Sequence, residues 1–427
     1  MAARLADDCF ITDRPRLSHD AAIAILADRL VPIAETEPVD LDAAGGRILA
    51  EPVAALRAVP AHANSAVDGY AFAHDDLGSV RSAPWPVIGR AAAGHPHIGA
   101  HRSGHAVRIF TGAVMPAGTD TVVMQEDVEL IDGEPARIRI RPGLKRGANV
   151  RRAGEDVAAG ETLFNPGALL RPQDLAALAA LGRAEVTCYR RLRIAVVSTG
   201  DEVVRPGARD LAPGEVFDAN APMLRALADL AGGEVADLGV WRDDAVGVQR
   251  QLAAHAPRYD AIVTTGGASK GEEDHMAAAL EALGTRHVWQ LAIKPGRPIM
   301  FGQIGGTVVV GLPGNPVAVL VCFLMYVHPL LRRLGGAPWR EPRRYALPAA
   351  FTVPSRKTDR REFWRGMLIT RADGTLAVDK FARDGSGLIS GLRAADGLID
   401  IPEPIASVQP GDPVAFIPFA EFGIIGH

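Results

Sequence analysis

The stretch from Ile262 to Pro316 decides the fold class, and its three telling parts read IVTTGGASKGEEDHM (262–276), LAIKPGRPIMFG (291–302) and VVVGLPGNP (308–316). In each part a short apolar run ends in glycine or proline, and polar residues lie at the turn that follows. Such runs are typical of buried parallel strands, whose carboxyl ends form the ligand-binding edge of an open α/β sheet. The sequence therefore predicts a central, doubly wound and mostly parallel α/β domain.

The turns of this stretch have the features of an anion-binding site. Asn315 favours the N-cap of a helix, and Pro316 then occupies the first helical position. A helix N-terminus offers unpaired N–H groups and partial positive charge, and glycines let a ligand approach the backbone. Arg297 adds positive charge, as do Lys270 and Lys294, which are two of only five lysines in the chain. The pattern favours a phosphate site over ordinary strand-to-helix turns.

Carboxylates recur where successive predicted strands end. Glu202 follows IAVVSTG, Asp243 follows EVADLGV, and Asp274 follows DAIVTTGG. Because parallel strands end at one edge of the sheet, these groups can hold Mg²⁺ together with substrate phosphates. Two structural alternatives stay open: Asp243 or Asp244 as a helix N-cap, and Glu202 as a solvated turn residue.

The rest of the chain divides into further domains around the central one, which spans 188–334. Ser18 N-caps an amphipathic helix, and the segments 18–53 and 147–187 together predict a mixed N-terminal domain. Short β-branched runs between prolines and glycines predict an all-β domain inserted at 54–146. Similar spacing after Pro338 predicts a C-terminal β domain, resembling a barrel, at 338–427.

Composition excludes several classes of protein. With 48% hydrophobic and 22% charged residues the chain is globular, and its net charge of -4 argues against a nucleic-acid binder. Three scattered cysteines predict no disulfide and a cytoplasmic location. No signal peptide is expected at the acidic N-terminus, and the apolar run from Val317 to Leu331 is interpreted as a buried helix rather than a membrane span.

Several motifs, in order and spacing, resemble the molybdopterin molybdenumtransferase (MoeA) family, to which the E domain of gephyrin also belongs. The motifs that carry the resemblance are NSAVDGYA (64–71), RIFTGAVMPAGTDTVVMQED (108–127), NVRRAGED (149–156), STGDEV (198–203), FDANAPML (217–224), GVWRDD (239–244), TTGGASKGEED (264–274), LAIKPGRP (291–298) and GLPGNP (311–316).

The resemblance implies the last step of molybdenum cofactor synthesis. Molybdate and adenylylated molybdopterin would be the substrates, cleavage would depend on Mg²⁺, and AMP would leave. It also implies a homodimer with shared active sites, and it leaves open whether the molybdopterin adenylyltransferase docks here. Neither nucleic acid nor a membrane is expected as a partner. A pterin-binding scaffold that has lost catalysis is the alternative from another class, and a different nucleotide-cleaving enzyme is the weaker rival.

Matching motif by motif assigns functional positions. The resemblance implies catalytic roles for Asp68, Thr111, Asp156, Glu202, Asp243 and Asp274. It implies ligand contacts for Gly266, Gly267, Ser269, Lys294, Arg297, Gly314, Asn315, Arg365 and Ser386. Glu202, Asp243 and Asp274 are expected to hold Mg²⁺ or orient water.

The remaining roles follow from the same resemblance. Ser269 and the neighbouring glycines would cradle phosphate or pterin. The cations at 294, 297 and 365, together with Ser386, would hold molybdate. Asp68 and Thr111 would reach across the dimer interface.

Two departures from the family pattern stand out. Arg297 occupies a position where many members have lysine, and it keeps the charge while offering two donors to an oxyanion. Lys270 replaces an apolar residue, and it either touches phosphate or is solvated.

Four histidines between His95 and His105 leave a zinc site open as a weak alternative, because no cysteine accompanies them.

Overall fold

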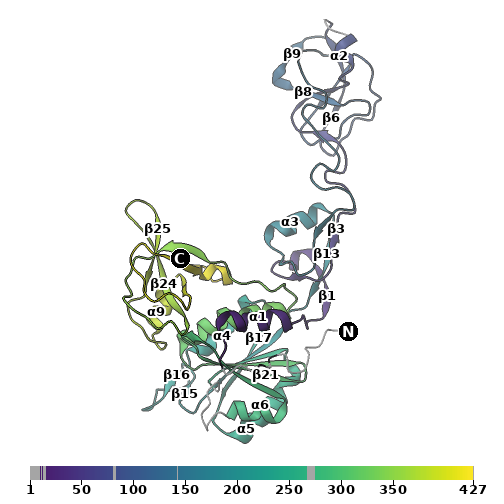
Figure 1. Cartoon of the computed structure of the whole chain (residues 1–427). Coiled ribbons are helices and arrows are strands. Elements are labelled where there is room, and N and C mark those ends of the chain that lie inside the picture. The colour runs from purple at the N-terminus through teal and green to yellow at the C-terminus, as the bar shows by residue number, and fades with distance from the viewer. Residues whose placement is uncertain are drawn as a thin grey trace.

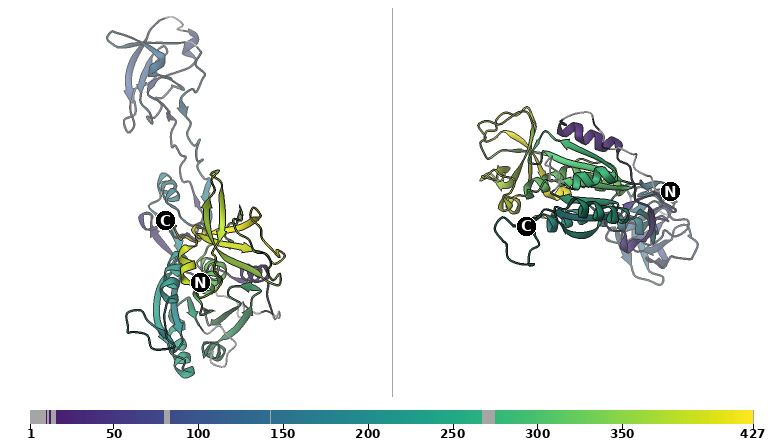
Figure 2. Two further views of the ribbon diagram at one scale, coloured as in Figure 1. Left: turned by 90° about the vertical axis from the view of Figure 1, so that its left-hand side faces the viewer. Right: turned by 90° about the horizontal axis from the view of Figure 1, so that it is seen from below.

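The protein is elongated, with one domain held away from the others at the end of an arm (Figures 1 and 2). A computed structural model describes residues 10, 12, 16–79, 83–141, 143–266 and 275–426. The central α/β domain and the C-terminal β domain pack side by side at the other end of the molecule (Figure 1). Several of the side chains that the sequence assigns to ligand binding lie where these two domains meet.

The central sheet has the strand order β17-β14-β18-β22-β21-β19. Its strands are β14 (Arg193–Thr199), β17 (Glu234–Trp241), β18 (Ala261–Thr265), β19 (Thr285–Gln290), β21 (Pro298–Ile304) and β22 (Thr307–Leu312). The first four strands in this order run parallel, as the alternating pattern predicts. A helix connects β14 to β17 and another connects β17 to β18, whereas β22 follows β21 directly along the chain. Strands β21 and β19 form an antiparallel edge, so the sheet is mixed.

Helices cover both faces of the central sheet. One face packs against α1 (His19–Arg29), α4 (Asn220–Leu230), α7 (Pro316–Cys322), the π-helical η4 (Phe323–Val327) and α8 (His328–Leu334), and the other against α5 (Ala245–His255) and α6 (His275–Leu283). Ser18 caps α1 as predicted, because its Oγ accepts the N–H of Ala21 at 3.2 Å. These two helical layers, one on each face of the sheet, confirm the prediction of a doubly wound domain.

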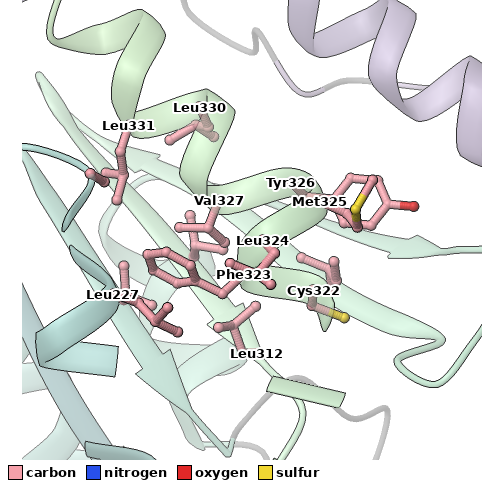
Figure 3. Close-up of a cluster of buried hydrophobic side chains, with 14 of the residues drawn as sticks. Leu227, Leu312, Cys322, Phe323, Leu324, Met325, Tyr326, Val327, Leu330 and Leu331 are labelled. Carbon is pink, nitrogen blue, oxygen red and sulfur yellow. The ribbon is translucent and has the colours of Figure 1, made fainter. Parts of the chain in front are cut away.

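The helix Pro316–Leu334 is the centre of the largest hydrophobic core (Figure 3). Within the described residues it alone is long and apolar enough to cross a membrane, judged by length and composition. However, 83% of its apolar window is buried inside the protein. Its apolar character is therefore explained by packing, for example against Leu227 of α4 and Leu312 of β22 (Figure 3).

One expectation about the strands is wrong. The run LAIKPGRPIMFG does not form a parallel strand of the central sheet. Its first part becomes β20 (Ile293–Lys294), which leaves that sheet and pairs in parallel with β24 (Arg361–Thr370) of the C-terminal domain. Its second part becomes β21, which is antiparallel to β22. Side-chain pattern alone does not distinguish these pairings, because both kinds of strand are buried here.

The C-terminal domain is a β domain, as predicted, built on the order β20-β24-β26-β27-β23, and β25 pairs with the C-terminal half of β24. Its other strands are β23 (Tyr345–Pro348), β25 (Leu376–Lys380), β26 (Gly397–Ile401) and β27 (Pro413–Pro418), and a short helix, α9 (Ile389–Ala394), precedes β26. Because β20 comes from the central domain, a shared strand ties the two domains together.

The N-terminal domain and the arm are built from segments on both sides of the inserted domain. The N-terminal domain contains β1 (Thr36–Asp40), β2 (Ile48–Leu49), β13 (Glu185–Tyr189) and α3 (Pro172–Ala180). Two narrow ribbons lead outward: β3 (Val53–Ala54) with β12 (Thr162–Phe164), and β4 (Asn64–Ser65) with β11 (Val150–Arg151). The inserted domain carries β5 (Gly69–Phe72), β6 (Trp85–Ala91), β7 (Ala106–Ile109), β8 (Thr121–Met124), β9 (Val128–Ile131) and β10 (Arg137–Ile140), with the short helix α2 (Asp76–Ser79).

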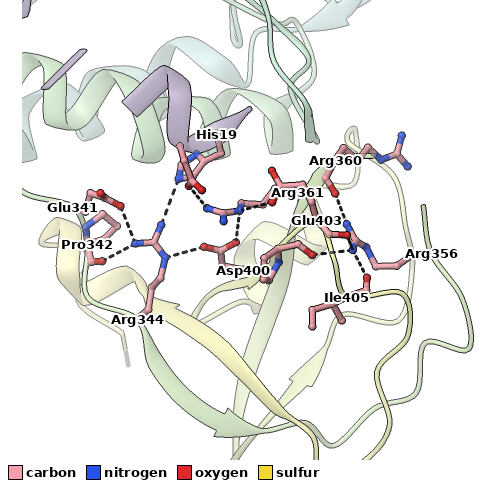
Figure 4. A network of polar contacts seen from close by, with 12 residues as sticks. His19, Glu341, Pro342, Arg344, Arg356, Arg360, Arg361, Asp400, Glu403 and Ile405 are labelled. Atoms are coloured by element: carbon pink, nitrogen blue, oxygen red, sulfur yellow. Dashed lines mark hydrogen bonds and ion pairs between the residues drawn. The ribbon is translucent and has the colours of Figure 1, made fainter. Parts of the chain in front are cut away.

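A polar network joins α1 to the C-terminal domain (Figure 4). His19 is buried, with Nδ1 2.9 Å from the hydroxyl of Tyr326 and Nε2 3.4 Å from Nη2 of Arg344. Arg344 also donates through Nε to Asp400 at 2.8 Å. Arginine can only donate, so Nε2 of His19 is the acceptor and its Nδ1–H donates to Tyr326.

This geometry predicts a pH-dependent stability. Burial, followed by the charges of Arg361 and Arg344, lowers the pKa of His19 from 6.5 to about 3. An unfolded chain takes up a proton as the pH falls below 6.5, whereas the folded protein does not until about pH 3. The contribution is therefore complete above pH 6.5, and about 2 kcal/mol is lost between pH 6.5 and 5.

Replacing His19 with glutamine should flatten this dependence. We expect the drop in Tm between pH 7 and pH 5 to be clearly smaller in His19→Gln than in the wild-type protein. The exposed His62 provides the matched control, and His62→Gln should keep the wild-type dependence. Equal drops in all three proteins would contradict the assigned protonation of His19.

Candidate functional site

A cavity of about 510 Å³ lies between the central and C-terminal domains, and we call it the cationic cavity. It collects five of the side chains that the sequence assigns to ligand binding: Lys294, Arg297, Asn315, Arg365 and Ser386. Within the described residues, no carboxylate lies within 4 Å of the guanidinium of Arg297. Arg297 is exposed to the cavity, so its charge is available to an anion.

Pairing of β20 with β24 positions Lys294. The register places Lys294 opposite Glu362, and its Nζ lies 3.8 Å from Glu362 Oε2. Glu362 is buried and already accepts hydrogen bonds from Arg360 at 3.1 Å and from the indole of Trp364 at 2.9 Å. Glu362 therefore orients the exposed lysine without fully neutralising it, and Lys294 keeps donors for a ligand.

Arg365 is buried and holds the wall of the cavity. Its Nη1 donates to the carbonyl of Leu388 at 3.0 Å, and its Nη2 donates to the carbonyl of Arg383 at 2.6 Å. Its guanidinium also lies over the ring of Phe381, 4.7 Å from the centroid. The fork of charged donors thus holds both ends of the loop between residues 383 and 388, and the N–H of Val317 donates to the carbonyl of Ser386 within it at 2.9 Å.

Gly296 lines the cationic cavity. Gly296 has φ +99, and an added Cβ would overlap Sγ of Cys322 on the core helix. A side chain is excluded at this position both by backbone conformation and by packing. The glycine in KPGRP therefore lets the loop lie directly against α7.

A second, neighbouring cavity of about 300 Å³ lies over the carboxyl ends of β14 and β18, and we call it the polar cavity. The expected Glu202, Gly266 and Gly314 line it. So do two residues that the sequence did not single out, Ser198 and Asn220.

Two buried oxygens of the polar cavity have no hydrogen-bond partner among the described residues: Ser198 Oγ and Asn220 Oδ1. The amide nitrogen of Asn220 is fully used, donating to Thr265 Oγ1 and to the carbonyl of Gly314, each at 2.7 Å. Buried polar atoms without partners cost about 1–3 kcal/mol each. These oxygens are satisfied if a ligand with N–H or O–H donors binds here.

Asn315 lines both cavities and is the residue that joins them. It occupies the N-cap position before α7, as predicted, yet its side chain makes no capping hydrogen bond. Its amide is therefore turned to the cavities instead of the helix end. A ligand that extends from the polar cavity into the cationic cavity passes Asn315.

The carboxylates at the edge of the sheet take different positions. Glu202 faces the polar cavity, and its carboxylate has no partner within the described part of the chain. Asp243 accepts the backbone N–H of Asp201 at 3.2 Å, and both residues are exposed. Asp244 is the N-cap of α5, which confirms the structural alternative for that residue.

The comparisons with known proteins identify the family. "MoeA N-terminal region (domain I and II)" matches residues 17–182, "Probable molybdopterin binding domain" matches 195–333, and "MoeA C-terminal region (domain IV)" matches 346–419. A molybdopterin molybdenumtransferase of Haemophilus influenzae is 37% identical over 94% of this chain and 98% of its own length. The chain belongs to the MoeA family of molybdopterin molybdenumtransferases.

Two further relatives agree with this assignment. Molybdopterin molybdenumtransferase 2 of Mycobacterium tuberculosis is 36% identical over 87% of this chain and 92% of its own. The crystal structure of a molybdopterin biosynthesis MoeA protein from Pyrococcus horikoshii is 31% identical and superposes with a TM-score of 0.78, covering 95% of this chain and 99% of that one. The multidomain architecture is therefore that of the MoeA family.

Three expected residues of this MoeA chain lie in or beside the inserted domain, far from both cavities of the same chain (Figure 1). Asp68 accepts the N–H of Thr111 at 2.7 Å and its hydroxyl at 2.8 Å, and these bonds lower the pKa of the Asp68 carboxyl below its usual range. The two residues thus form a local hydrogen-bonded pair. Asp156 is exposed in the loop that follows β11.

Other expectations lie outside the described residues, namely Gly267, Ser269, Asp274 and the open question of Lys270. Among the described residues no group of three or more metal-ligating side chains is found. In the histidine-rich loop, His101 pairs with Asp76 at 3.0 Å.

Sequence reasoning missed Ser198 and Asn220, although both fall within the family motifs. Asn220 could have been predicted from its position, because it follows a strand and a turn and begins α4. Lys380 was missed as well, and it lines the cationic cavity. Lys380 could have been singled out from the composition, because lysine is rare in this chain.

Proposed function

We propose that this protein inserts molybdate into adenylylated molybdopterin with release of AMP, the last step of molybdenum cofactor synthesis. The observation that carries the proposal is the pair of adjoining cavities that share Asn315, one cationic and one polar with the carboxylate of Glu202 at its wall. Relatives over most of the chain are named for molybdenum transfer to molybdopterin.

The cationic cavity suits a tetrahedral dianion such as molybdate. Lys294 and Arg297 supply exposed charge, and Ser386 lies on the loop that Arg365 fixes. A cation–anion pair about 4 Å apart is worth roughly 4 kcal/mol at an effective dielectric near 20, before desolvation. Two such pairs discriminate strongly between an oxyanion and a neutral solute.

The polar cavity suits the pterin and phosphate parts of the second substrate. The free oxygens of Ser198 and Asn220 require donors, which the N–H groups of a pterin provide. Backbone at Gly266 and Gly314 leaves room for close approach by phosphate. The dithiolene would then point past Asn315 toward the oxyanion.

The residues present fit a magnesium ion. Glu202 is an exposed carboxylate facing the polar cavity, and Asp243 lies at the same edge of the sheet. Hard oxygen donors and a phosphoanhydride are the surroundings that Mg²⁺ prefers. When bound, the ion would withdraw charge from the phosphoanhydride and stabilise the leaving AMP.

We further propose a homodimer in which each active site uses both chains. Its support is the distance of Asp68, Thr111 and Asp156 from the cavities of their own chain (Figure 1). The arm that carries them projects away from the molecule, as an element that serves a second copy would (Figure 2). Two-fold symmetry then makes two equal sites.

We also propose a cytoplasmic location for the protein and docking of the molybdopterin adenylyltransferase. The first is consistent with Cys188 and Cys322, which are buried free thiols. A reducing compartment keeps such thiols free.

The test is release of AMP from adenylylated molybdopterin upon addition of molybdate. We expect turnover by the wild-type protein and a loss of about 100-fold in Glu202→Gln, because the variant keeps the shape but removes a charge that holds the metal or orients water. Asp201 is exposed beside it, and Asp201→Asn should lose much less. A purified protein that binds the pterin substrate but never releases AMP would favour the non-catalytic scaffold.

A further inference from the structure

An ion pair lies inside the cationic cavity and is used by nothing described above. Lys380, the last residue of β25, has Nζ 2.7 Å from Asp384 Oδ1 and 3.5 Å from the carbonyl of Phe381. The side chain of Lys380 is 15% exposed, and its ammonium lies over the ring of Trp364, 5.6 Å from the centroid. Both charged residues line the cavity.

Asp384 is the acidic member of a cavity wall whose other charged residues, within the described part of the chain, are all cations. Its side chain is 68% exposed, so the carboxylate is solvated at the wall. The hydrogen bond from Lys380, with the charges of Lys294 and Arg365 farther away, holds the pKa of this carboxyl below its usual range. Asp384 therefore carries a full negative charge where an oxyanion is to bind.

Stability does not account for this pair. The carboxylate of Asp384 is exposed, and an ion pair with a solvated member contributes only about 0–1 kcal/mol to folding. A carboxylate that faces an incoming dianion opposes binding, at a distance of several ångströms, by a comparable or larger amount. The carboxylate of Asp384 therefore weakens binding of the ligand unless Lys380 neutralises it.

We propose that Lys380 is a further binding residue for the oxyanion and that Asp384 is its positioning residue. An ammonium has three donors, so Lys380 can keep its hydrogen bond to Asp384 and donate to the oxyanion at the same time. Packing on Trp364 and the bond to Asp384 limit the rotation of an otherwise flexible side chain. The pair thus places one ordered donor without adding net charge to the cavity. This inference rests on the proposed use of the cavity for molybdate.

The test is a calorimetric titration of the full-length protein with molybdate. Lys380→Met should weaken binding by about ten-fold or more, because it removes a cation and also exposes the charge of Asp384. Asp384→Asn should strengthen binding a few-fold, because asparagine still accepts the hydrogen bond that positions Lys380 but carries no negative charge. Lys380→Met with Asp384→Asn should bind more tightly than Lys380→Met alone.

The pattern separates this role from a structural one. A purely structural pair would give weaker binding and a lower Tm for both single variants, and the gain with Asp384→Asn would be absent. The exposed Lys357 lies outside the cavity, and Lys357→Met controls for the change in net charge and should bind as the wild type does.

Two outcomes overturn the inference at different levels. If Lys294→Met with Arg297→Met abolishes binding but Lys380→Met stays within two-fold of the wild type, Lys380 is not a ligand, and the proposed function stands. If the wild-type protein shows no saturable binding of molybdate, the proposed use of the cavity fails together with this inference.

Discussion

Two inactive variants of this protein should regain activity when they are combined in one dimer. The first variant is Asp68→Asn on the arm, and the second is Lys294→Met with Arg297→Met in the cationic cavity. Each homodimer should have less than about 1% of wild-type activity, because every site lacks either the arm carboxylate or the oxyanion cations. After co-refolding, one site of each heterodimer collects both defects and the other collects neither.

The expected recovery of activity follows from the fraction of heterodimers in the mixture. Random association makes about half of the dimers heterodimers, and each has one intact site, so about a quarter of wild-type activity should return. Asparagine at position 68 still accepts the hydrogen bonds from Thr111, which keeps the local turn. The loss therefore reports the charge of Asp68 and not a misfolded arm.

Controls on the same arm make the result specific. Asp132 is an exposed carboxylate on the inserted domain, and Asp132→Asn should be active without a partner variant. Mass spectrometry establishes that heterodimers have formed. Heterodimers that remain inactive would show that the arm of one chain does not complete the site of the other.

Arg365 should be the second most sensitive position. Arg365→Met keeps the length and much of the packing on Phe381 but removes both donors to the loop that carries Ser386. Two hydrogen bonds from a charged group are worth roughly 3 kcal/mol, which corresponds to about 100-fold. We expect the half-saturating concentration of molybdate to rise by that factor, with little change in binding of the nucleotide part.

Arg365→Lys distinguishes geometry from charge. Lysine keeps the positive charge but cannot donate to the carbonyls of Arg383 and Leu388 in one planar fork. If the fork positions the loop, this variant should be almost as impaired as Arg365→Met. Near wild-type dependence on molybdate in Arg365→Lys would mean that charge alone matters there.

The local elements of the central domain could be predicted from the sequence. Alternating apolar strands and amphipathic helices specify their own secondary structure, and a cap such as Ser18 marks a boundary. The carboxyl ends of β14 and β18 formed the polar cavity as expected, because parallel strands connected by helices must end at one edge.

Pairing between distant segments could not be predicted in the same way. Nothing in Ile293–Lys294 signals that it joins β24 of another domain, since a two-residue strand has no periodicity to analyse. The antiparallel edge formed by β21 has the same apolar composition as its parallel neighbours. Such choices depend on tertiary packing.

Which residues gather at one cavity could be predicted where a motif named the residue, and not where the fold created the surroundings. Lys294, Arg297 and Ser386 converge on one cavity as the family motifs imply. The ion pair of Lys380 with Asp384 was not foreseen, because both residues become important only when β25 and its following loop close the cavity. The bond between Asp68 and Thr111 likewise required coordinates.

The most direct test of the account is a crystal structure of the protein soaked with tungstate, whose metal scatters anomalously and whose shape matches molybdate. The account predicts an anomalous peak in the cationic cavity, within hydrogen-bond reach of Lys294 or Arg297 and beside Ser386. A well-occupied tungstate elsewhere, with this cavity empty, would contradict the assignment of the cavity to the oxyanion.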